Sequence, residues 1–376
     1  MAATFPVPGP GVLPSQWLVR AVDEGLVRWD RAHVPEPAVQ PASLDLHLGD
    51  VAYRLRCSFL PDTGHTVEER LEDFVMGEVD LRKGGVLERN RPYLIPLVEE
   101  LDLPVDVRAK ANPKSSTGRI DVFCRVLTDH SYRFDEVAAG YSGRLYLEVI
   151  SSTFTIRVEP GLALNQLRLA TGRSFVGDAE LLTTHQKSGL LFQDGHPLAD
   201  DALARADGLF LGLDLTGDED GVVGYRAKRN SRLLDLSAIG GHDPDDYWEP
   251  VVRERGNQVV LEPEEFYLLL SAQAIRIPPE FAGEMVAFDP TSGELRTHYA
   301  GFFDPGFGYD ESGMPGSRAA LEVRAHDVPF MVQHGLRVCK IAYERLCEPA
   351  ATLYGSAIGS NYQGQMSTLS KYFRKP

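Results

Sequence analysis

VLERNRPYL (residues 86–94) and VLEPEEFYL (residues 260–268) are two versions of one segment, separated by 174 positions. The same offset relates SGRLYLEV (142–149) to GSRAALEV (316–323). It also relates the stretches that begin RVEPG at residue 157 and MVQHG at residue 331. A constant offset over much of a chain is typical of an internal duplication. We therefore expect two copies of one domain.

The length of the chain agrees with this division. A chain of 376 residues suits two domains better than one hydrophobic core. Residues 184–208 are rich in Gly, Asp and polar residues, as a connection between domains would be. We place the first domain with its connection at residues 1–205 and the second at residues 206–376.

Short runs of β-branched and aromatic residues recur in each copy, as in DVAYRL, YLIPLV and LYLEVIS, with Gly, Pro and Asp between them. This pattern predicts a mainly β fold, an antiparallel sandwich or barrel with few short helices. One amphipathic helix is predicted over residues 14–26, capped by Ser15. Its apolar face is formed by Trp17, Leu18, Ala21, Val22 and Leu26.

Charge and composition exclude several classes of protein. The formal net charge is −16, which disfavours a nucleic-acid duplex as partner, because such binding needs many Lys and Arg contacts to phosphates. No apolar run is long enough to span a membrane, and the start lacks the features of a secretory signal, so we expect a cytoplasmic protein. The four cysteines form no CxxC pair, and we expect buried thiols without disulfides.

The familiar catalytic motifs are missing from the sequence. None of the ten histidines begins an H-x-E motif, and no P-C-x-x-C follows, so we expect no zinc site. The phosphate-binding G-x-x-x-x-G-K-[ST], the dinucleotide-binding G-x-G-x-x-G and the hydrolase G-x-S-x-G are missing too. Enzymes built on these motifs are therefore excluded.

ANPKSSTGR (111–119) is the best candidate for binding an anion. Ser115 and Ser116 offer hydroxyl and backbone donors in a predicted turn, and Lys114 and Arg119 add charged donors for phosphate oxygens. An alternative interpretation is an ordinary surface turn with two solvated cations.

Two glutamates occupy matching strand positions, Glu148 in LYLEV and Glu322 in AALEV. Each is a candidate buried general base, although strands also carry outward-facing glutamates. The C-terminal stretch from Leu353, rich in Gly, Ser and Gln, is by composition a candidate disordered tail.

Taken together, these stretches resemble the dCTP deaminase family, relatives of the trimeric dUTPases. VQPASLDLHLG (39–49), KSSTGR, YSGRLYLEV and VEPGLALNQLRL occur in family order in the first copy. The second copy carries AGFFDPGFG (300–308), which is similar to the family's nucleoside-binding stretch. LYGSAIGSNYQGQMSTLSK (353–371) is similar to the family's closing segment. The length resembles that of the long, internally duplicated bacterial members.

The resemblance implies two tandem dUTPase-like β domains and a zinc-free hydrolysis of dCTP to dUTP and ammonia, with Mg²⁺ bound to the triphosphate. A glutamate would act as general base, and Ser115 and Arg119 would orient the water and the carboxylate. The bases implied are Glu322 or Glu148. The implied substrate contacts are Lys114, Ser116, Asp304, Asp135, Tyr354, Tyr362 and Gln365.

Each copy departs from the family pattern in a different place. The first copy has FDEVAAGYSG (134–143) where the family has DPGF, which leaves Asp135 as a surrogate. The second copy has DPTSGELR (289–296) where the family has its serine and arginine turn, so Ser292 and Arg296 match only with shifted spacing. The economical hypothesis is one composite site, with the turn of the first copy facing the Asp304 segment and tail of the second.

Two alternatives stay open from the sequence. The nearest is a dUTPase or a bifunctional deaminase that continues to dUMP. A more distant alternative is a nucleotide sensor without catalysis, which the partly altered motifs of both copies favour. In each case the resemblance implies a homo-oligomer with a trimer-like arrangement of β domains.

Overall fold

The computed structural model describes residues 4–30, 34, 39–287, 295–297, 301–309, 313–325, 327–355, 362 and 368–375. The chain forms two compact units in which strands predominate, as expected. The first unit comprises residues 1–174, 230–242 and 346–351, and the second comprises the remaining residues. The sequence places the boundary near residue 205. The compact units instead divide after Ser174, and residues 175–205 belong to the second unit.

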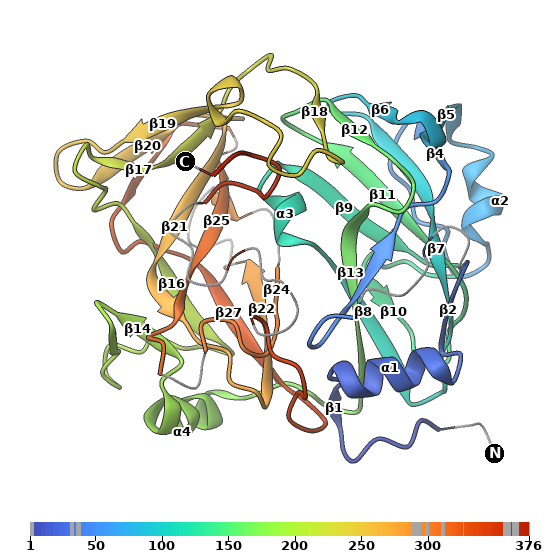
Figure 1. Ribbon diagram of the computed structural model, residues 1–376, viewed down its shortest axis with the longest axis horizontal. Helices are drawn as coiled ribbons and strands as arrows, with labels where there is room; N and C mark the ends of the chain where they lie inside the picture. The colour runs from blue at the N-terminus through green and yellow to red at the C-terminus, as the bar shows by residue number, and fades with distance from the viewer. Residues whose placement is uncertain are drawn as a thin grey trace. The chain divides into compact units, whose positions relative to one another are not determined.

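The first unit contains two antiparallel sheets, drawn mostly in blue to green in Figure 1. One sheet has the order β1-β13-β8-β10, with β3 paired to β13, and the other has the order β5-β4-β7-β11-β9, with β2 paired to β7. The bounds of these strands are β1 (Gly11–Val12), β2 (Val27–Trp29), β3 (Leu44–His47), β4 (Val51–Leu55), β5 (Val75–Asp80), β7 (Pro92–Asp102), β8 (Val107–Pro113), β9 (Val122–Leu127), β10 (Glu136–Val137), β11 (Ser142–Ser151) and β13 (Ala163–Thr171).

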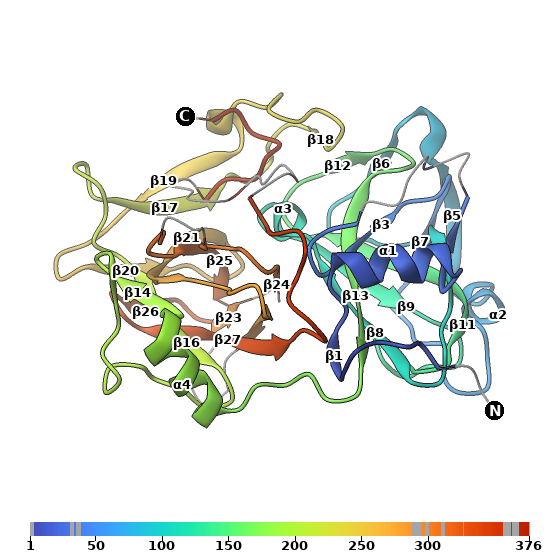
Figure 2. The same ribbon diagram turned by 60° about the horizontal axis from the view of Figure 1, so that its bottom comes forward.

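The second unit is built around the long strands β21 (Phe266–Ile275) and β25 (Ser317–Ala325). Helix α4 (Asp178–Ser188) lies near β14 in Figures 1 and 2, and its Glu180 pairs with Arg345 at the end of β27. The other strands of this unit are β14 (Leu191–Gln193), β15 (His196–Pro197), β16 (Leu209–Asp214), β17 (Val222–Ala227), β19 (Trp248–Val252), β20 (Gln258–Leu261), β22 (Phe281–Ala287), β23 (Leu295–Thr297), β24 (Phe302–Phe303), β26 (Phe330–Gln333) and β27 (Arg337–Arg345).

Strand register confirms the duplication inferred from the sequence. In the first unit β7 pairs with β11 so that Leu94 lies opposite Glu148, and in the second β21 pairs with β25 so that Leu268 lies opposite Glu322. Both members of the second pair are displaced by 174 positions from the first. The two glutamates therefore occupy the same place in two copies of one sheet.

A buried tyrosine repeats with the same offset. The hydroxyl of Tyr93 accepts a hydrogen bond from the backbone N–H of Glu88 at 3.3 Å, and that of Tyr267 accepts one from Glu262 at 3.0 Å. Both rings are buried. A buried phenol needs a partner for its hydroxyl, and each copy supplies it from the turn that precedes the strand.

A short strand pair, which is β6 (Gly85–Leu87) with β12 (Ile156–Val158) in the first unit and β20 with β26 in the second, differs between the two copies. In the first unit β6 pairs with β12, and β18 (Leu234–Asp235) adds a third strand parallel to β12 (Figure 1). Asp235 of β18 lies 3.5 Å from Arg157 of β12. In the second unit β20 and β26 form a two-stranded ribbon within the described residues.

The first helix, α1 (Ser15–Asp23), lies beside β1 in Figure 2 and buries Leu18 and Ala21, as predicted. The predicted cap is wrong. Pro14 is the N-cap residue and Ser15 is the first helical residue, with no side-chain cap. Proline suits this place because its fixed φ and missing N–H cost nothing at a helix start.

The cysteines are less uniform than expected. Cys124 and Cys339 are buried, and burial raises the pKa of both thiols, while Cys347 is half-buried with its pKa raised to about 11. Cys57 is exposed, which corrects the prediction that all four are buried. All four thiols are free.

A buried hydrogen-bonded pair of side chains, His47 and Glu99, joins the two sheets of the first unit. His47 on β3 places Nδ1 2.5 Å from Oε1 of Glu99 on β7, and the backbone N–H of His47 donates to Oε2 at 2.9 Å. Both side chains are at most 9% exposed. One carboxylate therefore satisfies two buried donors of the same residue.

Replacing Glu99 by alanine is expected to destabilise the first unit by about 3 kcal/mol or more, because it leaves the buried imidazole and backbone N–H of His47 without their acceptor. Urea unfolding measures the loss. Glu100→Ala is a matched control, because this neighbouring glutamate pairs with the exposed Arg144 and should cost at most about 1 kcal/mol. Equal losses from the two variants would contradict the assignment.

Candidate active site

The KSSTGR stretch forms a single helical turn directly after β8. Lys114 is the N-cap residue of α3 (Ser115–Gly118), and Arg119 is its C-cap. Ser116, Thr117 and Arg119 are buried, and Lys114 and Ser115 are half-buried. The alternative of a solvated surface turn is therefore wrong. Within the described residues, the hydroxyl of Ser115 makes no hydrogen bond, which leaves it available to a ligand.

Residues of β3 and β13 hold this turn in place. Lys114 forms an ion pair with Oδ2 of Asp45 on β3, and its backbone N–H donates to Leu164 O at 3.0 Å. Asn165 on β13 accepts hydrogen bonds through Oδ1 from the backbone N–H groups of Asn112 (3.1 Å) and Gln166 (2.7 Å). These contacts fix the direction in which the turn leaves β8, so the position of Ser115 is set by buried polar groups.

Glu148 is closed off by neighbours in its own unit. Its side chain is 1% exposed, and its Oε1 accepts from Nε of Arg125 at 3.0 Å and also pairs with Nη2. The guanidinium of Arg125 also donates to Ser58 Oγ at 2.9 Å and lies 3.7 Å from the ring centroid of Phe134. The arginine therefore engages Oε1 of Glu148 and occupies the space beside it.

The connection between β4 and β5, residues 56–74, covers this face of the sheet. It packs Phe59, Val67 and Leu71 against Leu94 and Tyr146. Strand alternation places Tyr146 and Glu148 on the same face of β11. Residues 56–74 therefore form a hydrophobic cover on the face of the sheet that carries Glu148. A catalytic Glu148 would need this face to be open to substrate.

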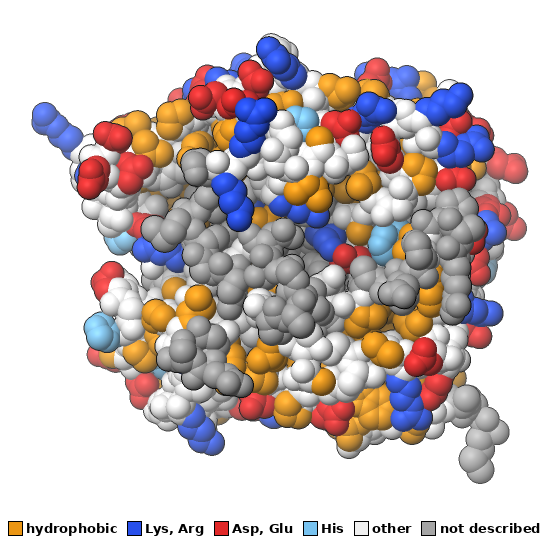
Figure 3. All heavy atoms as spheres, in the orientation of Figure 1, with side chains coloured by type: hydrophobic (Ala, Val, Ile, Leu, Met, Phe, Trp, Pro, Cys, Tyr) orange, Lys and Arg blue, Asp and Glu red, His pale blue; other side chains and the backbone are white. Residues whose placement is uncertain are grey.

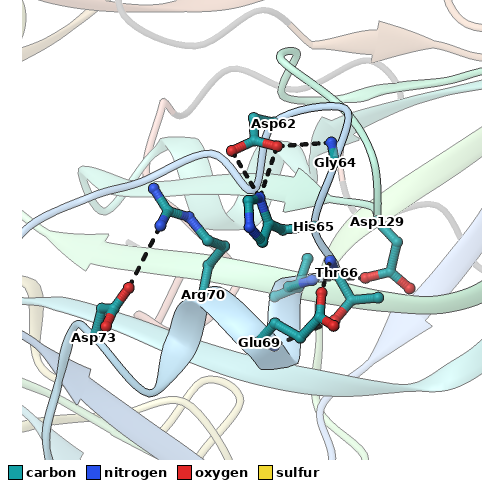
Figure 4. Close-up of polar contacts among 9 residues, drawn as sticks. Asp62, Gly64, His65, Thr66, Glu69, Arg70, Asp73 and Asp129 are labelled. Atoms are coloured by element: carbon teal, nitrogen blue, oxygen red, sulfur yellow. Dashed lines mark hydrogen bonds and ion pairs between the residues drawn. The ribbon is translucent and has the colours of Figure 1, made fainter.

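Polar contacts hold that cover in place, as Figure 4 shows. Helix α2 (Val67–Leu71) begins with a capping box, in which Thr66 and Glu69 satisfy each other's backbone N–H groups. Asp129 accepts from the backbone N–H of Val67 at 2.7 Å. Asp62 accepts from the backbone N–H of Gly64 and contacts His65. Acceptors from this unit thus engage the backbone N–H groups of Thr66, Val67 and Glu69 at the start of the helix.

Asp135, the surrogate predicted for the missing DPGF stretch, supports the backbone of β9. Its Oδ1 accepts from the backbone N–H of Val126 at 2.8 Å, and its backbone lies in the left-handed region at φ 62°. Burial raises the pKa of this carboxyl to about 7. Its role as a substrate contact stays a prediction.

Asp135→Asn is expected to stabilise the protein at pH 8 by about 1–2 kcal/mol, because asparagine keeps the acceptor for Val126 without the charge. The folded-state pKa of Asp135 lies above its unfolded value, so the wild type loses stability as pH rises from about 4 to 7. The advantage of the variant should therefore grow from pH 5 to pH 7 and then level off. Denaturant unfolding across this range measures it, and an advantage independent of pH would contradict the account.

The second unit brings Asp304 and the start of the tail together. In the DPGF stretch the backbone N–H of Phe307 donates to Asp304 O at 3.1 Å, and Tyr354 donates to Pro305 O at 2.8 Å. The ring of Tyr354 lies 5.8 Å from that of Phe307. Gly306 has a φ of 97°, which favours glycine, and a Cβ there would meet the backbone of Tyr354.

Glu322 lies in the middle of β25 and is 6% exposed. Its charge lies close enough to Cys339 to add to the burial that raises the pKa of that thiol. In this unit the connection that follows β17 does not repeat the cover of the first unit. Its residues 230–242 carry β18 and belong to the first unit. The surroundings of the two glutamates therefore differ, although their strands match.

For three of the predicted site residues, the structure describes little or nothing of their surroundings. Ser292 and Gln365 lie outside the described residues, and Arg296 is described only as part of β23, opposite Arg324 on β25. Tyr362 is described, and its backbone N–H donates to the hydroxyl of Tyr354 at 3.2 Å. The composite arrangement of the two copies stays a prediction.

The described part of the chain has neither a cluster of metal ligands nor a membrane-spanning helix. No group of three or more His, Cys, Asp and Glu side chains has the arrangement of a metal site there. Among the same residues, no helix has the length and hydrophobicity needed to cross a bilayer. Figure 3 shows cationic and anionic side chains interspersed over the face it presents.

Comparison with known families covers almost the whole chain. Residues 9–173 match the model of the 2'-deoxycytidine 5'-triphosphate deaminase N-terminal domain, and residues 177–373 match that of the C-terminal domain. The chain belongs to the dCTP deaminase family. The two matched segments meet at the division between the compact units, which supports a boundary near residue 175.

A solved structure shares the fold over nearly its full length. The 2'-deoxycytidine 5'-triphosphate deaminase of Agrobacterium tumefaciens is 42% identical and superposes with a TM-score of 0.82. The match covers 90% of this chain and 99% of that one. The dUTPase-like β fold expected from the resemblance is therefore supported by the family and by its architecture.

Curated relatives match over a shorter stretch. The "dCTP deaminase, dUMP-forming" of Salinispora tropica is 34% identical over 125 residues, which is 32% of this chain and 61% of the relative. The protein of the same name from Corynebacterium glutamicum strain R is 32% identical over 152 residues, which is 38% of this chain and 76% of the relative. These relatives thus match less than half of this chain.

Sequence reasoning missed the residues that support the turn. Asp45 and Asn165 lie inside stretches that carry the family resemblance, but neither was identified as a support of the turn. The signal was available, because an aspartate and an amide that alternate with apolar residues in a predicted buried strand need partners. It missed Arg125 too, which has no motif and is brought to Glu148 by strand pairing.

Proposed function

We propose that this protein deaminates dCTP to dUTP and ammonia. Membership of the dCTP deaminase family gives the reaction class. The observation that carries the proposal is the turn at residues 114–119, which places the half-buried Ser115 beside a buried arginine and an anchored lysine. A turn of this kind suits a site where phosphate oxygens and a water molecule are held by fixed donors.

The proposed chemistry needs no metal held by the protein, and Mg²⁺ would enter with the triphosphate. Lys114 and Ser116 contact phosphate oxygens, and Ser115 and Arg119 orient the attacking water. Addition of this water to C4 of cytosine builds a tetrahedral centre, and the general base takes one proton from the water and delivers it to the ring nitrogen N3. The base then moves the remaining hydroxyl proton to the amino group as the bond between C4 and that nitrogen breaks. Water supplies the oxygen, and ammonia carries the amino nitrogen away. Asp304, Tyr354, Tyr362 and Gln365 are the proposed contacts to the rest of the nucleotide.

We assign the general base to Glu322. A base must reach the water and must exchange protons during turnover. Glu148 is tied to Arg125 under the cover formed by residues 56–74, so its Oε1 is already engaged by a guanidinium. Glu148 therefore has a structural role in this proposal, and Arg125 is its fixed counterion.

The residues of a working site occur in one complete set per chain. The serine and arginine turn is intact only in the first copy, and the DPGF stretch is intact only in the second. We therefore propose one catalytic site for each chain. Because family sites are assembled where β domains meet, a homo-oligomer with a trimer-like arrangement of domains is part of the proposal.

Product analysis tests the reaction. Metal-stripped protein is incubated with dCTP, with and without added Mg²⁺, and the nucleotides are separated by chromatography. The proposal predicts dUTP with one equivalent of ammonia, and no gain from added zinc. Unchanged dCTP under all conditions would contradict it and would favour the nucleotide sensor.

A second candidate is the bifunctional reaction that ends at dUMP. It is favoured by the names of the Salinispora and Corynebacterium relatives, which are dUMP-forming. The full-length match to the Agrobacterium structure, named simply as a deaminase, favours dUTP. Appearance of dUMP and pyrophosphate in the same chromatogram would select the bifunctional enzyme.

A further inference from the structure

The C-terminal end of the chain is seated in an aromatic cluster. Phe373 is 3% exposed, and its ring packs edge-on against Tyr247 at 5.4 Å and Trp248 at 5.8 Å between centroids. Trp248 in turn lies 6.1 Å from Phe266 on β21. Both views in Figures 1 and 2 place the red segment that leads to the end of the chain beside β19, the strand that begins with Trp248. Phe373 is thus packed against side chains of the second unit.

Hydrogen bonds lead from this seat back to the DPGF stretch. The backbone N–H of Lys371 donates to the hydroxyl of Tyr362 at 3.2 Å, and the backbone N–H of Tyr362 donates to the hydroxyl of Tyr354 at 3.2 Å. Tyr354 itself is bonded to Pro305 through its backbone. Tyr362 is therefore held from two sides, by Tyr354 toward the Asp304 stretch and by Lys371 toward the anchored end.

The end of the tail is anchored mainly by the packing of Phe373 against Tyr247 and Trp248. A fully buried phenylalanine contributes through its area and its edge-on ring contacts. The nearby ion pair of Arg374 with Asp243, at 3.7 Å, is exposed at both partners and contributes little. Loss of the Phe373 ring should therefore release the end of the tail, whereas loss of Arg374 should not.

We propose that Phe373 is a positioning residue for nucleotide binding, because it keeps Lys371 at Tyr362 and Tyr362 beside the Asp304 stretch. This inference rests on the proposed function, in which Tyr354 and Tyr362 contact the nucleotide. A segment fixed at both ends samples a smaller volume than a free tail, so its residues have a higher effective concentration at the site. The gain appears in binding and not in the chemical step.

The test compares steady-state kinetics of Phe373→Ala with those of the wild type. KM for dCTP should rise about tenfold or more, and kcat should stay within about threefold, because the anchor contributes no reacting group. Phe373→Leu keeps most of the buried volume and should return KM to within about threefold of the wild type. Arg374→Ala should leave KM unchanged.

Phe281→Ala is the matched control for lost aromatic packing. Phe281 lies in the same unit, is 7% exposed and packs edge-on against Tyr343. It should lower thermal stability as Phe373→Ala does, without raising KM. Equal rises in KM for the two variants, or a fall in kcat alone for Phe373→Ala, would overturn the inference.

A second readout separates this inference from the proposed function. Amide hydrogen exchange of residues 353–375 in the absence of nucleotide should become faster in Phe373→Ala and stay unchanged in Phe281→Ala. If the wild type does not convert dCTP, the proposed function fails. The anchor itself is still judged by this exchange, and unchanged exchange in Phe373→Ala would refute it.

Discussion

Replacing Glu322 by glutamine is expected to lower kcat for dCTP deamination about 10³-fold or more, whereas Glu148→Gln should keep kcat within about threefold. Glutamine keeps the size of the side chain but cannot accept and return a proton. The two substitutions are chemically identical and fall on matching positions of β25 and β11. Any difference in kcat between the two variants is therefore caused by the different surroundings of the two glutamates.

Those surroundings predict different kinds of loss. Glu148 neutralises Arg125 in a buried pair, so Glu148→Gln should reduce the free energy of unfolding by about 2 kcal/mol or more. Glu322→Gln should leave dCTP binding measurable while turnover is lost. Retained activity in Glu322→Gln together with an inactive, folded Glu148→Gln would reverse the assignment.

The second large effect is expected at the turn of the first copy. Ser115→Ala should lower kcat about 10²-fold or more, because the hydroxyl that orients the water is removed. Arg119→Lys should cost at least as much, since a lysine does not reproduce the planar set of donors of a buried guanidinium. Both rates are measured as ammonia release under saturating dCTP.

Ser292→Ala in the second copy is the matched control. It removes the same hydroxyl from the stretch that corresponds to the turn after the duplication, and it should leave kcat unchanged. Circular dichroism and thermal unfolding of each variant separate a catalytic loss from a folding defect. Equal losses from Ser115→Ala and Ser292→Ala would refute the idea of one complete residue set per chain.

The duplication and the β fold were predictable because both can be recognised from the order of residues alone. The offset of 174 positions in the sequence reappears as strand register, with Leu94 opposite Glu148 and Leu268 opposite Glu322. A turn at residues 114–119 was predictable from its residue types, and its role as an anion site stays a prediction. The burial of this turn was not predictable, since that depends on β3 and β13 lying beneath it.

The features that escaped prediction depend on contacts between distant segments. Glu148 and Glu322 look alike in sequence, and only strand pairing shows that Arg125 lies opposite Glu148. The path of residues 230–242 into the first unit follows from pairing of β18 with β12. The seat of Phe373 likewise requires Trp248, which lies more than a hundred positions earlier.

We propose that each chain carries one working site, with Glu322 as its base. Calorimetric titration of the Glu322→Gln variant with dCTP and Mg²⁺ tests this most directly, because the variant binds the substrate without consuming it. The account predicts one nucleotide bound per chain, with binding abolished or strongly weakened when Lys114→Met is added. Two equivalent nucleotides per chain would contradict it, because the first copy would then have a working site of its own.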